Sequence, residues 1–235
     1  MGSYAFILAR GGSKRVPLKN IRIFHGKPMI SYAINAAIKS GIFDRVIVST
    51  DSKTIAEVGI SYGAEVPKLR NPNLADDTTP TIQVISNEIK SFNLNDSDSV
   101  CCIYGTNPFL TKELLKIGYD LLHQKKNKVD FNYVSTVTDY SFPPQRGLKM
   151  LNNNVFEMIN KENLMKRSQE LENYFHECAQ FWWSDARTWL DQVPMQDKLL
   201  GIYLPRWKQQ DIDTEDDWKE AEYKYFALKN YRNAN

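Results

Sequence analysis

A cluster of cations interrupted by two glycines follows the first apolar run of the sequence. Residues 5–9 are apolar and predict a buried strand, which ends where Gly11 and Gly12 begin a loop. The loop contains four cations and no acid: Arg10, Lys14, Arg15 and Lys19. Glycines let a backbone approach a ligand closely, so their N–H groups can point at anionic oxygens. The spacing matches neither a P-loop nor a dinucleotide fingerprint, but the residue types predict a polyphosphate site.

Two carboxylates near the other end of the chain suggest a metal site. In an extended segment Asp211 and Asp213 point to one side, and Ile212 is buried on the other. Mg²⁺ is typically held by one or two carboxylates together with phosphate oxygens. No cation beside them in the sequence neutralises the two aspartates, so we expect them to bind Mg²⁺. We assign the acids of residues 215–217 instead to the first turn of a helix that Thr214 caps.

The remaining pattern predicts the elements that position these residues. A helix over residues 28–40, a strand over 46–48 and a helix over 53–62, capped by Asp51 or Ser52, begin a doubly wound parallel α/β sheet. Ligands bind such sheets at the carboxyl ends of the strands, where the basic loop lies. The other predicted strands cover residues 64–67, 100–104, 130–136 and 200–204, and the other predicted helices cover 79–92, 112–124 and 215–229.

Residues 139–186 do not continue the alternation of strand and helix. This stretch is rich in aromatic residues, and we expect it to leave the main sheet. For Trp182 and Trp183 we favour packing in a core or an interface over ligand contact. Aromatic side chains outside the main alternation would leave a large apolar patch exposed, which predicts a homodimer. The aromatics concerned are Tyr174, Phe175, Trp182, Trp183 and Trp189.

Length and composition limit the possible classes of protein. A chain of 235 residues fits one domain over residues 1–235. A net charge of +2 predicts no general surface for nucleic acid, and no apolar stretch approaches the length of a membrane span. The three cysteines lack the spacing of a zinc site or a disulfide framework, and this suits the reducing cytoplasm.

Three motifs resemble those of a known enzyme family. The stretch ARGGSKRVPLKN, residues 9–20, resembles the signature of the acylneuraminate (CMP-nonulosonic acid) cytidylyltransferases, which activate 2-keto-3-deoxy sugar acids. Residues 70–78 and 211–217 resemble the family's RPxxLAxDxT and DIDTxxD segments. The resemblance implies a three-layer α/β nucleotidyltransferase domain, Rossmann-like and of GT-A type. Within it, residues 139–186 would form a small lobe that pairs two subunits and closes the sugar pocket.

The resemblance also implies a reaction and the roles of its residues. CTP and a nonulosonic acid would give the CMP-sugar and pyrophosphate, with Mg²⁺ held by Asp211 and Asp213. The implied catalytic residues are Arg10, Lys19, Asp211 and Asp213. The implied nucleotide-binding residues are Ala9, Arg10, Gly11, Gly12, Ser13, Lys14, Arg15, Lys19, Asn20, Arg70, Thr78 and Thr81.

The sugar side resembles the pseudaminic acid branch of the family, through the residues around Arg167, His176 and Gln180. Tyr104 stands where the sialate branch usually has glutamine. We expect Tyr104, Phe181 and Trp182 to offer apolar surface to a 9-deoxy sugar. The implied sugar-binding residues are Tyr104, Arg146, Arg167, Gln169, His176, Gln180 and Phe181, with the two arginines on the sugar carboxylate.

Other functions remain open at this stage. The acceptor could be N-acetylneuraminic, legionaminic or 3-deoxy-octulosonic acid. A GT-A-like glycosyltransferase is a distant alternative, because such enzymes usually carry their DxD at a mid-chain strand end, and here it precedes the last helix. A catalytically silent nucleotide-binding partner is disfavoured by the intact loop and the two aspartates.

Overall fold

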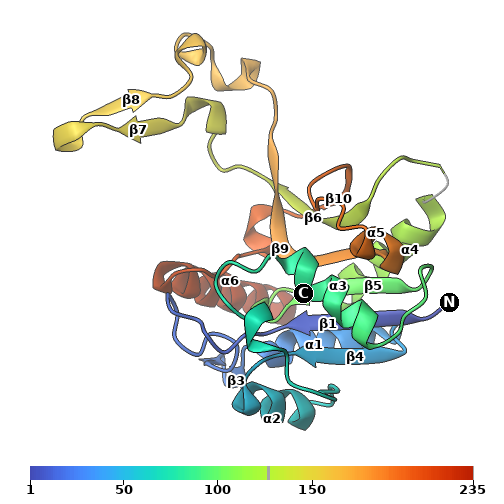
Figure 1. Cartoon of the computed structure of the whole chain (residues 1–235). Coiled ribbons are helices and arrows are strands. Elements are labelled where there is room, and N and C mark those ends of the chain that lie inside the picture. Colours follow the sequence, from blue (N-terminus) through green and yellow to red (C-terminus); the bar gives the residue numbers. More distant parts are fainter. Residues whose placement is uncertain (126–127, 235) are drawn as a thin grey trace.

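Six strands form one mixed sheet in the computed structural model, which describes residues 1–125 and 128–234 (Figure 1). The strand order across the sheet is β10-β6-β9-β5-β1-β4. Strand β1 runs parallel to β4 and β5, β10 runs parallel to β6, and β9 runs antiparallel to both of its neighbours. The strands are β1 Ser3–Leu8, β4 Arg45–Ser49, β5 Ser99–Tyr104, β6 Tyr133–Asp139, β9 Phe175–Asp185 and β10 Leu199–Tyr203.

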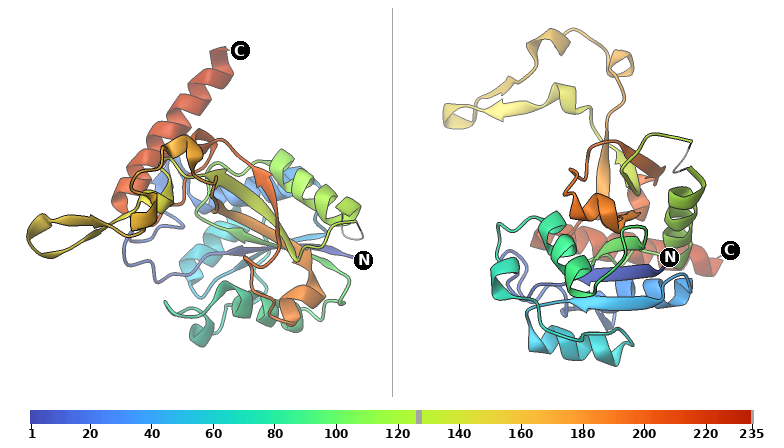
Figure 2. Two further views of the ribbon diagram at one scale, coloured as in Figure 1. Left: turned by 90° about the horizontal axis from the view of Figure 1, so that it is seen from above. Right: turned by 45° about the vertical axis from the view of Figure 1, so that its right-hand side comes forward.

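Helices cover both faces of this sheet and make three layers (Figure 2). Side chains of α1, α2 and α4 pack on one face, and those of α3 and α5 pack on the other. The last helix, α6, closes a third apolar cluster with Ile212, Phe24 and Trp218 beside the basic loop. The helices are α1 Ile30–Ser40, α2 Lys53–Ser61, α3 Thr81–Ser91, α4 Lys112–Lys125, α5 Ala186–Leu190 and α6 Glu215–Ala234.

Local signals fix several of these boundaries as predicted. The Ser52 hydroxyl accepts a hydrogen bond from the Ile55 amide at 3.4 Å and caps α2. Helix α1 ends at Gly41, whose φ of 67° suits glycine. The predicted strand over 64–67 is wrong, because only an isolated bridge between Ile47 and Glu65 forms there. The last helix runs five residues further than predicted, to Ala234.

The predicted departure from the sheet over residues 139–186 ends earlier than expected. The chain returns at Phe175, and β9 then fills the centre of the sheet between β5 and β6. Trp182 and Trp183 are buried on opposite faces of β9, and Trp189, which belongs to α5, is buried in the same cluster as Trp182. Core packing of the tryptophans is therefore confirmed, and they cannot form the exposed patch on which the dimer expectation partly relied.

Between β6 and β9 the chain forms an arm that projects from the carboxyl edge of the sheet (Figures 1 and 2). Residues 140–174 make up this arm, which contains the two-stranded ribbon of β7 Leu148–Met150 and β8 Phe156–Met158. Many of its apolar side chains are more than half exposed: Phe142, Leu148, Met150, Val155, Phe156, Ile159, Leu164 and Met165. The arm thus supplies the exposed apolar surface that the tryptophans do not.

Short elements complete the chain. These are β2 Ile23–Phe24, β3 Lys27–Pro28 and the 3-10 turns Pro72–Leu74, Pro144–Arg146, Asn152–Asn154, Lys161–Asn163, Ser168–Glu170 and Arg206–Lys208. Within the described residues, no helix has both the length and the apolar character needed to span a membrane.

Candidate active site

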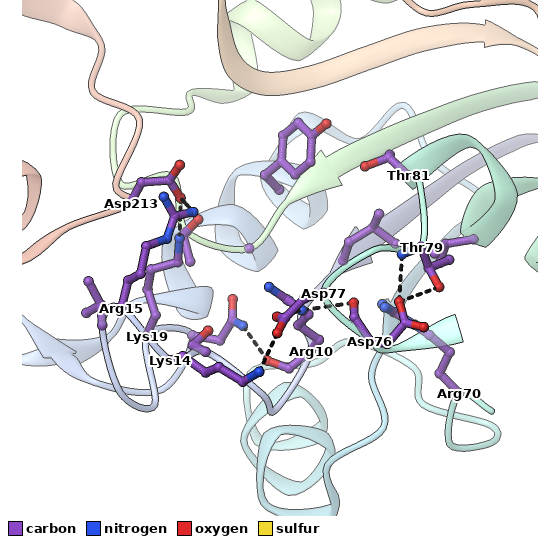
Figure 3. Close-up of a pocket in the computed structure, with 18 of the residues that line it drawn as sticks. Arg10, Lys14, Arg15, Lys19, Arg70, Asp76, Asp77, Thr79, Thr81 and Asp213 are labelled. Atoms are coloured by element: carbon purple, nitrogen blue, oxygen red, sulfur yellow. Dashed lines mark hydrogen bonds and ion pairs between the residues drawn. The ribbon is translucent and has the colours of Figure 1, made fainter. Parts of the chain in front are cut away.

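A pocket of about 270 Å³ opens at the carboxyl edge of the sheet, beside the basic loop (Figure 3). Its lining joins this loop to residues 70–84 and to the end of β5. Ten of the predicted site residues line it: Arg10, Ser13, Lys14, Arg15, Lys19, Asn20, Arg70, Thr81, Tyr104 and Asp213. The remaining predicted residues lie outside its lining: Ala9, Gly11, Gly12, Thr78, Asp211, Arg146, Arg167, Gln169, His176, Gln180 and Phe181.

The basic loop is anchored to the neighbouring strand end. The Gly11 amide donates to Asp51 Oδ1 at 2.8 Å, and a Cβ on Gly11 would lie 3.1 Å from that of Ser52. Asn20 Nδ2 donates to the Arg10 carbonyl at 3.0 Å and closes the loop from inside. The Gly11 amide is therefore already bonded within the chain. Its requirement for glycine comes from the close approach to Ser52.

The four cations of the loop converge on the pocket in two pairs, each held by one carboxylate. Arg10 and Lys14 lie 2.5 Å and 2.6 Å from Asp77. Arg15 and Lys19 lie 3.0 Å and 3.4 Å from Asp213, and Lys19 Nζ also donates to the Ile212 carbonyl. Asp213 therefore has cationic partners, and the expectation that both aspartates lack them is wrong for this residue. Such a cluster can bind several phosphate oxygens at once.

Arg70 forms part of the pocket wall through a buried chain of polar contacts. Its Nε donates to Ser49 Oγ at 2.9 Å, and Ser49 Oγ donates to Glu88 Oε1 at 2.5 Å. Burial lowers the pKa of Arg70, and the charges of Glu88 and Asp51 oppose this shift. The sequence did not single out Glu88, because a glutamate within a predicted helix is usually a solvent-exposed polar residue.

Tyr104 and Thr81 lie beside each other in the lining of the pocket, at the end of β5 and the start of α3. Burial raises the pKa of the Tyr104 phenol well above its ordinary value, so the group stays protonated and can donate a hydrogen bond. Thr78, a predicted nucleotide contact, instead donates its amide and hydroxyl to Asp76 Oδ1. The neighbouring Thr79 lines the pocket in its place.

The segment that carries the two aspartates buries Ile212, as predicted. Ile212 is fully buried between them against α6, and Asp213 turns into the pocket. Asp217 Oδ2 accepts hydrogen bonds from the Asp213 and Thr214 amides, and the Thr214 hydroxyl caps the helix as predicted. The pKa of Asp211 is raised to about 6, first because surrounding protein removes water and then because Asp213 is charged.

This arrangement fits a divalent cation. The raised pKa of Asp211 beside the charged Asp213 means that the negative charge of the two carboxylates is not fully compensated by the protein. A bound cation would stabilise both carboxylates in their charged form. The described residues hold no group of three or more His, Cys, Asp and Glu side chains suited to a metal. Two carboxylates are enough for Mg²⁺ only if ligand oxygens and water complete its shell. The residues thus fit a metal that arrives with a phosphate ligand.

Most of the predicted sugar-binding residues lie away from the pocket. Arg146, Arg167 and Gln169 belong to the arm. His176 lies where the arm rejoins the sheet, and its ring contacts that of Tyr140 at 4.8 Å between centroids with the planes tilted by 58°. Phe181 is fully buried in the core under α4, so it cannot offer apolar surface to a sugar, and the same is true of Trp182. The strand β9 explains both corrections, since it is covered on both faces.

Gln180 is also fully buried within β9. Among the residues that the structure describes, neither its amide nitrogen nor its amide oxygen has a hydrogen-bond partner. Of the seven predicted sugar-binding residues only Tyr104 lines the pocket of this chain.

Similarity to known proteins agrees with this geometry. The family model described as Cytidylyltransferase matches residues 4–234, which is nearly the whole chain. The chain belongs to the cytidylyltransferase family. A pseudaminic acid cytidylyltransferase of Campylobacter jejuni subsp. jejuni is 37% identical over 228 residues, which cover 96% of this chain and 97% of that protein. A CMP-N,N'-diacetyllegionaminic acid synthase of Legionella pneumophila subsp. pneumophila is 39% identical over 60% of this chain and 59% of its own length.

Solved structures of other proteins share the fold. A CMP:2-keto-3-deoxy-manno-octonic acid synthetase complexed with CTP superposes with a TM-score of 0.68 at 15% identity, covering 97% of this chain and 100% of that one. A 4-diphosphocytidyl-2C-methyl-D-erythritol synthase from Anaerococcus prevotii gives a TM-score of 0.60 at 12% identity, over 94% and 97% of the two chains. These likenesses support a nucleotidyltransferase-like α/β fold.

Proposed function

We propose that this protein transfers CMP from CTP to the anomeric hydroxyl of a nonulosonic acid, with pseudaminic acid preferred, and releases pyrophosphate. The observation that carries the proposal is the convergence of Arg10, Lys14, Arg15 and Lys19 on one pocket at the carboxyl edge of the sheet. Similarity to pseudaminic acid cytidylyltransferases over nearly the full length supports the choice of nucleotide and acceptor.

In the proposed reaction the anomeric oxygen forms a bond to the α-phosphorus of CTP. The bond from that phosphorus to the oxygen that bridges to the β-phosphate breaks, pyrophosphate leaves, and the hydroxyl proton passes to solvent. Phosphoryl and nucleotidyl transfers need mainly positioning and neutralised charge. Arg10, Lys14 and Arg15 hold the triphosphate and stabilise the charge that develops on pyrophosphate, and Lys19 fixes the loop that carries them.

The nucleoside lies, in this proposal, against the inner wall of the pocket. Asn20 and Arg70 are both buried. Asn20 donates a hydrogen bond to the basic loop, and Arg70 donates one to Ser49 at the end of β4. Thr81 lies beside Tyr104. Their fixed side chains suit the recognition of a base and ribose, because little entropy is lost when a ligand binds.

We further propose that Asp211 and Asp213 hold Mg²⁺ together with the nucleotide. A bound Mg²⁺ would neutralise phosphate charge and lower the pKa of the attacking hydroxyl. In the ligand-free protein the Asp213 carboxylate forms ion pairs with Arg15 and Lys19. When phosphate oxygens take over those cations, the Asp213 carboxylate becomes available to the metal.

The acceptor side of the site is proposed to form in a homodimer. Arg146 and Arg167, expected on the sugar carboxylate, lie on the arm and outside the pocket of their own chain. The exposed apolar side chains of the arm favour burial against a second copy. The arm of one subunit would then close the pocket over the sugar, as the family resemblance implies.

A substrate panel tests this function. Pyrophosphate release is measured with each of CTP, UTP, ATP and GTP against pseudaminic, legionaminic, N-acetylneuraminic and 3-deoxy-octulosonic acids. We expect CTP with pseudaminic acid to give the highest kcat/KM, and about tenfold to hundredfold less with N-acetylneuraminic acid, in line with the similarity to pseudaminic acid cytidylyltransferases over nearly the full length. Equal use of N-acetylneuraminic acid would refute the sugar choice, and no activity with any sugar acid would refute the reaction.

A further inference from the structure

The phosphate-binding loop already holds an anion of its own chain. Asp77 Oδ1 accepts a hydrogen bond from Arg10 at 2.5 Å, and Asp77 Oδ2 accepts one from Lys14 at 2.6 Å (Figure 3). The carboxylate thus presents one oxygen to each of two cations, as two oxygens of a phosphate group would. Arg10 and Lys14 are 67 and 63 residues away from Asp77 in the sequence, so the contact belongs to the folded pocket and not to a local turn.

The turn before Asp77 fixes it in this place. Asp76 Oδ1 accepts the Thr79 amide at 2.6 Å, the Thr79 hydroxyl at 2.8 Å and the Thr78 amide at 2.9 Å. These bonds, with that of the Thr79 hydroxyl first, lower the pKa of Asp76 to about 2. Arg10 also donates to the Asp76 carbonyl at 2.9 Å. Asp77 is therefore presented to the loop by a well-bonded turn.

We propose that Asp77 is a built-in competitor for phosphate. It occupies Arg10 and Lys14 in the empty site, the nucleotide triphosphate displaces it, and its return to the two cations favours the departure of pyrophosphate. The proposal rests on the proposed function, since it assigns the loop to polyphosphate. It goes beyond that function by giving the site a means of limiting the retention of its own product.

The charges and exposures make such an exchange reversible. Both ion pairs reach solvent, with Lys14 81% and Asp77 44% exposed at the side chain. Exposed pairs of this kind are individually weak, so a ligand with several phosphate charges can replace one carboxylate. Asp213, which holds the other two cations, has an alternative role at the metal. Asp77 has no such role in the proposed site, so its negative charge opposes bound phosphate.

Pyrophosphate binding without metal tests the proposal directly. Titration calorimetry in EDTA compares the wild type with Asp77→Asn, Asp77→Ala and Asp130→Asn. Asp130 is an exposed aspartate paired with Lys198 at 2.5 Å, outside the pocket lining, so its variant matches the change in net charge. We expect the two Asp77 variants to bind pyrophosphate roughly tenfold more tightly and to be inhibited by it at correspondingly lower concentration, and Asp130→Asn to match the wild type.

A double variant shows whether the effect of Asp77 acts through Arg10 and Lys14. In an Arg10→Ala background the gain from Asp77→Asn should shrink to about threefold or less, because only Lys14 is then released. Equal affinity of the wild type and both Asp77 variants, or an equal gain in Asp130→Asn, would overturn the competitor role while leaving the reaction standing. Absence of pyrophosphate binding in all of these proteins would overturn the assignment of the basic loop to phosphate, and with it the role of Asp77 as a competitor.

Discussion

The cations of the basic loop differ in how firmly the fold holds them. The Lys14 side chain is 81% exposed and pairs with Asp77, whereas the Lys19 side chain is 17% exposed and bonds to both the Ile212 carbonyl and Asp213. Lys14 is therefore available to a ligand with little consequence for the fold. Lys19 joins the loop to the segment that carries the two aspartates, so it stabilises the fold as well as adding positive charge to the site.

Substituting the two lysines should separate these roles. Lys14→Ala is expected to weaken CTP binding with no change in thermal stability, since an exposed pair contributes little to folding. Lys19→Ala should weaken binding and also lower the free energy of unfolding by about 1–3 kcal/mol, because it leaves the Ile212 carbonyl without its donor. Calorimetry and urea unfolding measure the two effects, and equal stability of both variants would contradict the assignment.

The two aspartates give a second prediction at the same scale. Asp211→Asn should lower turnover by a factor on the order of 10² or more, because a metal contributes several kcal/mol of charge stabilisation. Its melting temperature should stay close to that of the wild type or rise slightly, since Asp211 bears no ion pair among the described contacts and the amide removes its charge from beside Asp213. Full activity in EDTA, or in this variant, would exclude the metal assignment.

The residues of the basic loop were predictable because their types and spacing are local in the sequence. Asp77 was not, because its role appears only when the turn before α3 meets the loop, 63 residues away from Lys14. Asp51 was noticed as a candidate helix cap, yet its carboxylate bonds to the Gly11 amide and Ser52 caps the helix instead. Contacts between distant loops decide such roles, and a local pattern cannot reveal them.

At the scale of elements, the close fit between α4 and β9 organises one half of the core. Gly118 lies inside α4, and a Cβ there would stand 2.7 Å from Trp183 Cδ1 and 2.9 Å from Phe181 Cε2. The helix can approach the sheet only because this position lacks a side chain. Two aromatic residues of β9 fill the space that a larger residue would need.

Gly118→Ala therefore tests this packing. Alanine favours a helix over glycine by up to about 1 kcal/mol, but overpacking a core costs about 1–3 kcal/mol. Contacts below 3 Å mean that overpacking should win, so we expect a net loss of stability in urea unfolding. Gly12→Ala is the control, because no atom of the described part of the chain lies within 4 Å of a Cβ there, and its stability should match the wild type. A stabilised Gly118→Ala protein would show that the helix can move away.

Strand β9 was the main element that sequence reasoning missed. Its run of Phe181, Trp182 and Trp183 is buried on both faces, so it lacks the alternation of polar and apolar residues that marks a half-buried strand. It also returns to the centre of the sheet antiparallel, after a long arm, whereas alternating strands and helices predict only parallel neighbours. The parallel strands β1, β4 and β5, with helices between them, followed the expected pattern.

At the scale of the whole molecule, the arm is the feature that the sheet alone does not explain. The arm leaves the sheet at its carboxyl edge, the edge at which the pocket also opens. Both strands of its ribbon carry exposed apolar side chains. A monomer would leave this surface in water, which favours association through it. The residues expected on the sugar carboxylate lie on the same arm, so dimerisation and acceptor binding are linked in this account.

Light scattering tests the dimer. The wild type should have the mass of a homodimer at micromolar concentration, and the double substitution Met150→Asp with Phe156→Asp should give a folded monomer. These two residues face each other in the β7–β8 register and are 64% and 57% exposed, so charging them costs the isolated fold little. The monomer should also lose acceptor use more than CTP binding. A wild-type monomer would contradict the prediction.

Formation of CMP-pseudaminic acid from CTP and pseudaminic acid, quantified by chromatography, tests the central claim that this loop holds the triphosphate during transfer. The rate is compared between the wild type, Arg10→Ala and Arg187→Ala, an exposed arginine paired with Asp191 and Asp96 outside the pocket lining. We predict rapid product formation by the wild type and Arg187→Ala, and a loss of roughly tenfold to a hundredfold in Arg10→Ala, the value of one charged hydrogen bond. An unchanged rate in Arg10→Ala, or no CMP-sugar from the wild type, would contradict the account.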